Sequence, residues 1–344
     1  MRKMIWLFLL VSFSLAAYDP LNDLLERQDY SRLLSAAREA VINDESARNY
    51  YYLGAAYAGV DRDKLADKAF RTALEKPDLT YTIGVNIADY FETQGDPAMA
   101  ITVYKLAFQK FPQEKINTAQ KMSKVLSKQK QYQETIDIFT DLIDANPQTA
   151  NPLAYYVGVS YYTLDNMEKA EDYFQRALDS GYRDADVYLK QGELKVRRGQ
   201  WQAGLDLLSE GIKLGGAIFT PEPNTFKYLG QAYAKLEDTR NAADNFRKAI
   251  QAGSKDLDVY LQYAANASLN RDFQGVLQTL EPSAASHMRN GEYQYYLGNA
   301  YDNLGLSTQA IQYYQKALEA GYANTTMVRT RISELRRSNE EDYY

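Results

Sequence analysis

A repeat of about 34 residues is the feature of the sequence that most limits how the chain can fold. Bulky residues recur at spacings of 34, 35, 35, 34, 38, 34 and 34, at Phe70, Tyr104, Phe139, Phe174, Leu208, Phe246, Leu280 and Tyr314. A second series precedes each of them by thirteen residues, at Tyr57, Phe91, Leu126, Tyr161, Lys195, Tyr233, Ala267 and Tyr301. Since both series keep the same spacing, the sequence predicts one structural unit copied eight times.

The one longer spacing comes from residues 215–223, which contain Gly, Pro and the apolar pair Ile218 and Phe219. Turn-forming residues at both ends of this stretch predict a loop. The loop could serve as a hinge or as a contact surface. A neutral insertion is the alternative, because lengthening a surface loop costs little free energy.

Within one copy, the apolar residues follow the spacing of an amphipathic helix. In residues 292–304 apolar side chains recur every three or four positions, and the same holds in residues 308–318. Gly305 separates the two stretches and Gly321 follows the second. The alternating pattern of a strand does not occur. Each copy is therefore predicted to be a pair of helices, and the chain to be an all-α protein.

Four copies share a motif of small and aromatic residues. In the last of them it consists of Leu297-Gly298-x-x-Tyr301, then Gly305, Ala310, Tyr314 and Ala317. This motif resembles the tetratricopeptide repeat (TPR) in order and spacing. The resemblance implies a TPR-like alpha-alpha superhelical solenoid of about eight helical hairpins over residues 47–322. A degenerate N-terminal hairpin at 18–46 precedes it, and a capping helix at 323–337 and a polar tail at 338–344 follow it.

Packing explains why small and aromatic residues recur together in the motif. Gly and Ala at the crossing points allow two helices to approach closely, and a ring fills the space beside them. A larger residue at such a site would destabilise the fold by about 1–3 kcal/mol. We therefore expect Tyr296 and Tyr301 to be structural residues.

The resemblance also implies where a partner would bind. In TPR proteins the first helix of each copy lines a concave groove, and the corresponding residues here are Tyr51, Asp89, Glu92, Lys124, Tyr155, Val159, Tyr162, Glu193, Lys227, Gln231, Tyr295 and Asn299. The residues Lys128, Arg197 and Lys235 lie at its edge. A tyrosine offers a flat apolar face with a polar tip, which suits contacts with peptides or sugars. Packing between helices is the alternative role for the tyrosines, and plain solvation for the charged residues.

The first seventeen residues have the pattern of a secretory signal peptide. Arg2 and Lys3 precede an apolar run that ends in Ser14-Leu15-Ala16-Ala17. The run is shorter than the roughly 20 apolar residues of a transmembrane helix, so we expect cleavage and no transmembrane span afterwards, with a retained anchor as the alternative. Secretion across the inner membrane would place the protein in the periplasm or cell envelope. With no Cys in the chain, its stability would come from packing alone.

The composition argues against catalysis, cofactors and nucleic acid. The chain has one His, His287, and no Cys, so neither a multi-histidine metal site nor a serine or cysteine triad can be assembled. We expect His287 to be structural or solvated. The formal net charge is −6 and becomes more negative without Arg2 and Lys3, which disfavours binding to phosphate backbones. We therefore expect no enzyme, no cofactor and no metal.

These features together predict a binding protein. The main hypothesis is a non-enzymatic scaffold of the periplasm or cell envelope, which holds a protein or peptide segment of an envelope complex in its groove. The alternative is a glycan-binding accessory protein of cell-wall or exopolysaccharide handling, whose groove tyrosines stack on sugars. Whether an end copy also forms a homo-oligomer stays open.

Overall fold

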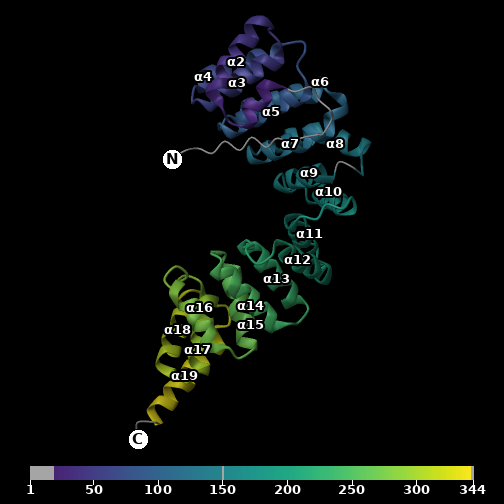
Figure 1. Ribbon diagram of the computed structural model, residues 1–344. Helices are drawn as coiled ribbons and strands as arrows, with labels where there is room; N and C mark the ends of the chain where they lie inside the picture. Colours follow the sequence, from purple (N-terminus) through teal and green to yellow (C-terminus); the bar gives the residue numbers. More distant parts are fainter. Residues whose placement is uncertain (1–18, 149–150, 342–344) are drawn as a thin grey trace. The chain divides into compact units, whose positions relative to one another are not determined.

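The described part of the chain consists of helices joined by short turns (Figure 1). The computed structural model describes residues 19–148 and 151–341. The predicted signal peptide therefore lies outside the described residues. Within them there are nineteen α-helices and no β-strand, which confirms the predicted all-α fold. The helices form two compact units, of which the first ends at Tyr182 and the second begins at Arg183.

Unit 1 contains five helical hairpins, each made of a first and a second helix. The first helices are α1 (Pro20–Glu26), α3 (Ala47–Gly59), α5 (Tyr81–Thr93), α7 (Lys115–Lys128) and α9 (Asn151–Thr163). The second helices are α2 (Tyr30–Asn43), α4 (Asp63–Glu75), α6 (Pro97–Lys110), α8 (Tyr132–Ala145) and α10 (Met167–Asp179). A 3-10 turn, η1 (Pro112–Glu114), precedes α7. The predicted degenerate N-terminal copy is thus a hairpin, with a shortened first helix.

Unit 2 contains four hairpins and a final helix. Its first helices are α11 (Ala185–Arg197), α13 (Pro223–Lys235), α15 (Leu257–Leu269) and α17 (Gly291–Asn303). Its second helices are α12 (Trp201–Gly215), α14 (Thr239–Gln251), α16 (Phe273–Leu280) and α18 (Ser307–Glu319), with a 3-10 turn η2 (Glu281–Ser283) after α16. The last helix, α19 (Thr325–Glu341), extends past the predicted end at Arg337. Its residues Val328, Ile332 and Leu335 pack against Ala310 and Tyr314 of α18.

The bulky series forms the core of both units. All eight residues of that series are at most 3% exposed. In four copies a first-helix glycine lies directly against this residue: a Cβ added to Gly54, Gly158, Gly230 or Gly298 would lie 2.6 to 2.8 Å from the ring of Phe70, Phe174, Phe246 or Tyr314. The motif therefore carries Gly at these sites because the second helix leaves no room for a side chain.

The turns inside the hairpins share one backbone conformation. Each contains a residue with positive φ: Gln28, Asp61, Gly95, Lys130, Asp165, Gly199, Glu237, Arg271 and Gly305. The amide of the residue after it donates a hydrogen bond to a carbonyl five residues earlier, near the end of the first helix. Arg62 donates in this way to Tyr57 at 2.9 Å, and Asp272 to Ala267 at 2.9 Å. This is the hydrogen bond of a Schellman helix end. Because it uses only backbone atoms, the copies with Lys195 or Ala267 in place of an aromatic residue keep the same turn.

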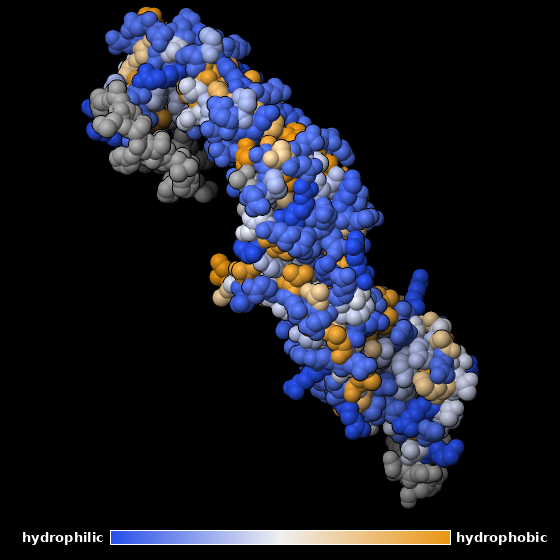
Figure 2. All heavy atoms as spheres, turned by 90° about the vertical axis from the view of Figure 1, so that its right-hand side faces the viewer, coloured by the Kyte–Doolittle hydropathy of each residue, from blue (hydrophilic) through white to orange (hydrophobic). Residues whose placement is uncertain are grey.

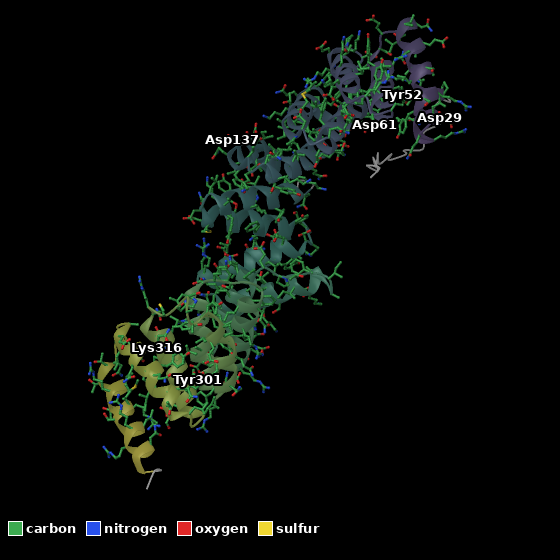
Figure 3. The ribbon with its side chains drawn as sticks, turned by 90° about the vertical axis from the view of Figure 1, so that its left-hand side faces the viewer. Asp29, Tyr52, Asp61, Asp137, Tyr301 and Lys316 are labelled. Atoms are coloured by element: carbon green, nitrogen blue, oxygen red, sulfur yellow. The ribbon has the colours of Figure 1, made fainter. Side chains whose placement is uncertain are left out.

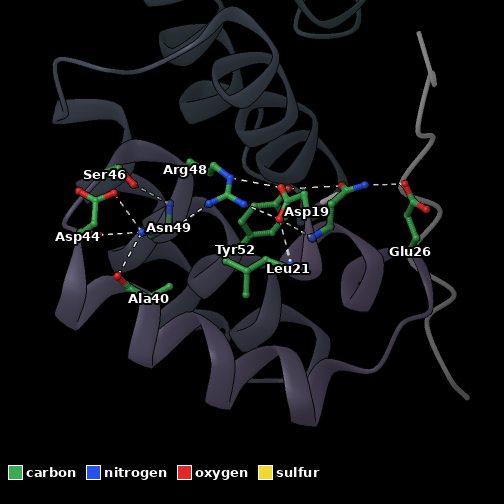
Figure 4. Close-up of polar contacts among 10 residues, drawn as sticks. Asp19, Leu21, Glu26, Ala40, Asp44, Ser46, Arg48, Asn49 and Tyr52 are labelled. Carbon is green, nitrogen blue, oxygen red and sulfur yellow. Dashed lines mark hydrogen bonds and ion pairs between the residues drawn. The ribbon is translucent and has the colours of Figure 1, made fainter. Parts of the chain in front are cut away.

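A polar network joins the N-terminal hairpin to the next copy (Figure 4). Asp19, which caps α1, accepts hydrogen bonds from the amide of Leu21 at 3.0 Å and from the hydroxyl of Tyr52 at 2.8 Å. The Arg48 guanidinium also donates a hydrogen bond to Asp19, at 2.5 Å. Burial opposes ionisation of Asp19, but the hydrogen bonds from Arg48 and Tyr52 hold its pKa below the usual value. This contact explains why the short α1 stays docked against α3.

Two segments of unit 2 depart from the repeat. Helix α16 has eight residues, whereas the other second helices have thirteen to fifteen. Pro282 follows it, and proline cannot continue a helix hydrogen-bond ladder. The inserted loop at 215–223 exposes Ile218 almost completely, at 98%, while the ring of Phe219 packs back onto Gly215.

Candidate functional site

The candidate groove residues lie on the first helices of each unit. Within unit 1, α1 lies against α3, α3 against α5, and α7 against α9; within unit 2, α11 lies against α13 and α15 against α17. We call the exposed side of these first helices the first-helix wall. It presents polar and aromatic side chains from successive copies, about one helix diameter apart.

The two candidate carboxylates of α5 are paired with lysines of α7. The Nζ atom of Lys121 lies 2.9 Å from Asp89, and that of Lys128 lies 2.9 Å from Glu92. Tyr104, on the second helix α6, also donates a hydrogen bond to Asp89. Partly exposed ion pairs of this kind stabilise a fold by about 0–1 kcal/mol. A partner that brings its own charges could therefore exchange with them at little cost.

Three equivalent tyrosines occupy one register of the wall. Each ring lies about 6 Å from the bulky core ring of its own copy: Tyr51 from Phe70 at 6.1 Å, Tyr155 from Phe174 at 6.2 Å, and Tyr295 from Tyr314 at 6.0 Å. These side chains therefore contribute to packing inside the hairpin as well as facing the wall.

Neighbouring residues cover part of each tyrosine ring on the side that a ligand would contact. Tyr51 is 7% exposed and its hydroxyl accepts a hydrogen bond from Asn86 at 3.2 Å. The ring of Tyr322 stacks on Tyr295 with centroids 4.5 Å apart and planes at 6°, and Tyr182 lies 5.4 Å from Tyr155. A ligand that needs both flat faces of a ring would find neither position suitable.

The candidates of α11 and α13 also have neighbours on the wall. Glu193 is 7% exposed and lies beside the hydroxyl of Tyr228. Burial, together with this carboxylate, raises the pKa of Tyr228 to about 12. Lys227 forms an ion pair of 2.6 Å with Asp256, which caps the next first helix, α15. Sequence reasoning found one member of each pair and missed the other.

Other candidates are more accessible. Lys124 is exposed and forms no ion pair with any residue of the described part of the chain. Gln231, Val159 and Tyr162 are partly exposed. Asn299 donates a hydrogen bond to the hydroxyl of Tyr295 at 3.3 Å. The edge residues Lys128, Arg197 and Lys235 are exposed.

Sequence reasoning missed five residues that contact the candidates: Asn86, Tyr182, Tyr228, Asp256 and Tyr322. For two of them a signal existed, because Gly181-Tyr182 and Gly321-Tyr322 occupy the same place in two copies. Each of the other residues contacts a candidate that belongs to a different copy. The motif describes positions within one copy, so it does not predict which residues of two copies meet.

In residues 19–148 and 151–341, no group of three or more His, Cys, Asp and Glu side chains is arranged to hold a metal ion. None of the helices described there is both long and apolar enough to cross a bilayer. His287 lies between two rings, 5.3 Å from Tyr260 and 4.7 Å from Tyr293, which is a structural position.

Comparisons with known proteins agree with this architecture. The family model of the tetratricopeptide repeat matches residues 155–180, 229–252 and 291–320. These segments belong to the copies built from α9 and α10, α13 and α14, and α17 and α18. A sequence search of curated proteins finds no match.

Several solved structures are similar in part. The crystal structure of YrrB, described as a TPR protein with an unusual peptide-binding site, is 17% identical, with a TM-score of 0.47 over 57% of this chain and 97% of that one. A tetratricopeptide repeat protein from Parabacteroides merdae is 13% identical, with a TM-score of 0.44 over 74% and 98%. The protein pilF of Pseudomonas aeruginosa is 19% identical, with a TM-score of 0.45 over 67% and 98%.

Stacked two-helix copies with a shared Schellman turn and a Gly–aromatic crossing define an α-α repeat protein. The chain contains tetratricopeptide repeats in the three copies that the family model matches, as TPR proteins do. Such proteins are generally protein-interaction scaffolds, and their fold is typically non-catalytic.

Proposed function

We propose that this protein is a non-enzymatic scaffold of the periplasm or cell envelope, which holds partner proteins on its first-helix wall. The observation that supports the proposal best is the surface of α5 and α7. Asp89 and Glu92 on α5 lie beside Lys121, Lys124 and Lys128 on α7 of the next copy. The two ion pairs between the helices are exposed enough to be exchanged. A partner segment that carries both acidic and basic side chains would match this surface.

The repeat geometry favours an extended or helical segment as the occupant. Each copy contributes only a few wall residues, so affinity would build up as a segment crosses several copies. Lys124, exposed and unpaired within the described residues, offers a cation to an acidic side chain of such a segment. Peptide contacts also suit tyrosines such as Tyr155, which can engage a ligand through the hydroxyl and the ring edge.

A pull-down with paired lysine variants would test binding at the wall. The mature protein, immobilised, would be used to capture proteins from an envelope extract, followed by mass spectrometry. We expect Lys124→Glu and Tyr162→Ala to lose the captured partner and Lys64→Glu to retain it, because Lys64 is exposed on the second helix α4.

Equal loss with Lys64→Glu would contradict a site on the first-helix wall. Capture of no protein, together with retention of oligosaccharide that Tyr155→Ala abolishes, would favour the glycan alternative.

The proposed location has a separate test. It is supported by the signal-peptide pattern of residues 1–17. N-terminal sequencing of the protein from a fractionated native cell should give a chain that starts directly after Ala17, in the envelope fraction. A full-length chain in the cytoplasmic fraction would contradict the proposed location without affecting the binding proposal.

A further inference from the structure

Unit 2 contains an open cavity that does not belong to the first-helix wall. It has a volume of about 920 Å³ and lies between residues 284–289, which follow α16, and the second helix α18. Met288 and Arg289 line it on one side, and Tyr313, Lys316 and Glu319 on the other. Its size is within the range of about 300–1,000 Å³ found for ligand pockets.

The cavity exists because α16 is short. The other second helices continue for thirteen residues or more, whereas α16 ends at Leu280, and Pro282 directs the chain into a 3-10 turn. The space that the last turn of a regular second helix would fill is left open beside α18. The three alanines that also line the cavity, Ala284, Ala285 and Ala320, are too small to close it.

Side-chain and backbone contacts hold residues 284–289 in place. The ring of His287 lies 5.3 Å from Tyr260 and 4.7 Å from Tyr293. The side chain of Gln294 donates a hydrogen bond to the His287 carbonyl at 3.2 Å. The hydroxyls of Ser283 and Tyr293 are 2.7 Å apart. The segment is therefore fixed away from α18, and the cavity is preformed.

The opposite side of the cavity is held in place by aromatic stacking. Tyr301 stacks on Tyr313 with centroids 5.4 Å apart and planes at 11°, and its hydroxyl donates to Glu281. The Nζ atom of Lys316 lies 4.4 Å from the centroid of the Tyr313 ring. Tyr301 and Lys316 lie in the same C-terminal part of the molecule (Figure 3). This cation–π contact holds the lysine at the cavity rather than in bulk solvent.

The chemistry of the cavity combines apolar surface with positive charge. Met288 is 62% exposed, and methionine adapts its shape to varied apolar side chains. Two cations, Arg289 and Lys316, face the cavity against one anion, Glu319. One face of the molecule is mostly hydrophilic, with hydrophobic residues in small scattered groups (Figure 2).

We propose that this cavity is a second binding site, which takes an acidic peptide segment of a protein partner, with an aliphatic side chain beside a carboxylate. The aliphatic side chain contacts Met288 and the alanines, and the carboxylate lies between Arg289 and Lys316. The charged and apolar side chains of the site come mainly from residues 284–289 and from the second helix α18, so it is independent of the partner proposed for the first-helix wall.

Methionine-methyl NMR would test the proposal on the mature full-length protein. The resonance of Met288, assigned with Met288→Leu, would be followed while the peptide Ac-Ala-Leu-Asp-NH2 is added. We expect a saturable shift with this peptide, and binding weaker by about tenfold with the neutral Ac-Ala-Leu-Asn-NH2, because the charge-assisted hydrogen bonds are lost.

Two variants separate the cavity from a general charge effect. The double variant Arg289→Glu, Lys316→Glu should lose the acidic peptide and bind Ac-Ala-Leu-Lys-NH2 instead. Lys255→Glu, which changes an exposed lysine of the same unit, should bind like the parent protein. Circular dichroism would verify that both variants keep their helices.

Three outcomes would overturn the proposal. They are an unchanged Met288 resonance with the acidic peptide, equal affinity for the Asp and Asn peptides, or a shift that depends only on protein concentration. The last would identify a second copy of this chain as the occupant.

Discussion

Replacing Gly54 by alanine tests the packing on which the repeat depends. The added Cβ would lie 2.6 Å from two atoms of the Phe70 ring, closer than two carbon atoms can approach. The ring cannot move aside, because Tyr90 lies 4.6 Å from it and Tyr51 lies 6.1 Å from it. Overpacking of this kind destabilises a core by about 1–3 kcal/mol.

Gly84 provides a matched control in the same unit. A Cβ there would meet only the Cβ of Ala107 at 3.9 Å, an ordinary contact. Both glycines lie inside a first helix, so both variants gain helix propensity of about 1 kcal/mol. The difference between the two variants therefore isolates the clash, and we expect Gly84→Ala to be the more stable by about 1–3 kcal/mol.

Urea unfolding followed by circular dichroism would measure this difference. With a slope of about 1–3 kcal/mol/M, the unfolding midpoints of the two variants should differ by on the order of 1 M. A Gly54→Ala protein as stable as Gly84→Ala would refute the reasoning, since it would mean that the second helix can move away from the first at no cost.

Three further predictions follow from other contacts. Lys130 has a φ of 57°, which costs a residue other than glycine about 1–2 kcal/mol, so Lys130→Gly should raise the melting temperature while Lys124→Gly, inside α7, lowers it. Burial lowers the pKa of His287, so the unfolded chain binds more protons than the folded one. Stability is therefore lost as the pH falls from above about 6.5 through the folded pKa, and melting curves of His287→Phe should lack this loss. Arg331 donates to Asp302 at 2.7 and 2.8 Å, and that carboxylate is 8% exposed. Arg331→Ala should therefore weaken the docking of α19 by about 1–3 kcal/mol, seen as faster hydrogen exchange in α19 than with the control Arg329→Ala.

The hairpins and their core could be predicted because they repeat. Every copy places a bulky residue at the same phase, so Phe246 and its equivalents gave one consistent signal of burial. The turns were harder to predict, because residues such as Lys130 and Arg271 occupy a conformation that glycine usually marks. Backbone hydrogen bonds fix the conformation there, and because any residue can form them, the residue type at the turn does not reveal it.

For the candidate site, the sequence predicts only the helix on which each residue lies and its position along that helix. Whether a wall residue is available depends on residues outside its own helix. Lys121 of the next copy pairs with Asp89, and Tyr322, which follows α18 in the same copy, covers Tyr295. Such contacts join positions about 30 residues apart, and several side chains of the neighbouring copy could reach each one. The cavity beside α18 did have a signal, because Pro282 falls where the other second helices continue.

The common turn has a consequence for how such a chain can change its length. Each hairpin bends at a residue of the same conformation, from Gln28 to Gly305. A recombination event that joins one such bend to another would add or remove a whole copy and keep the same backbone conformation at the junction. The protein's reach along a partner can thus be altered in steps of one copy.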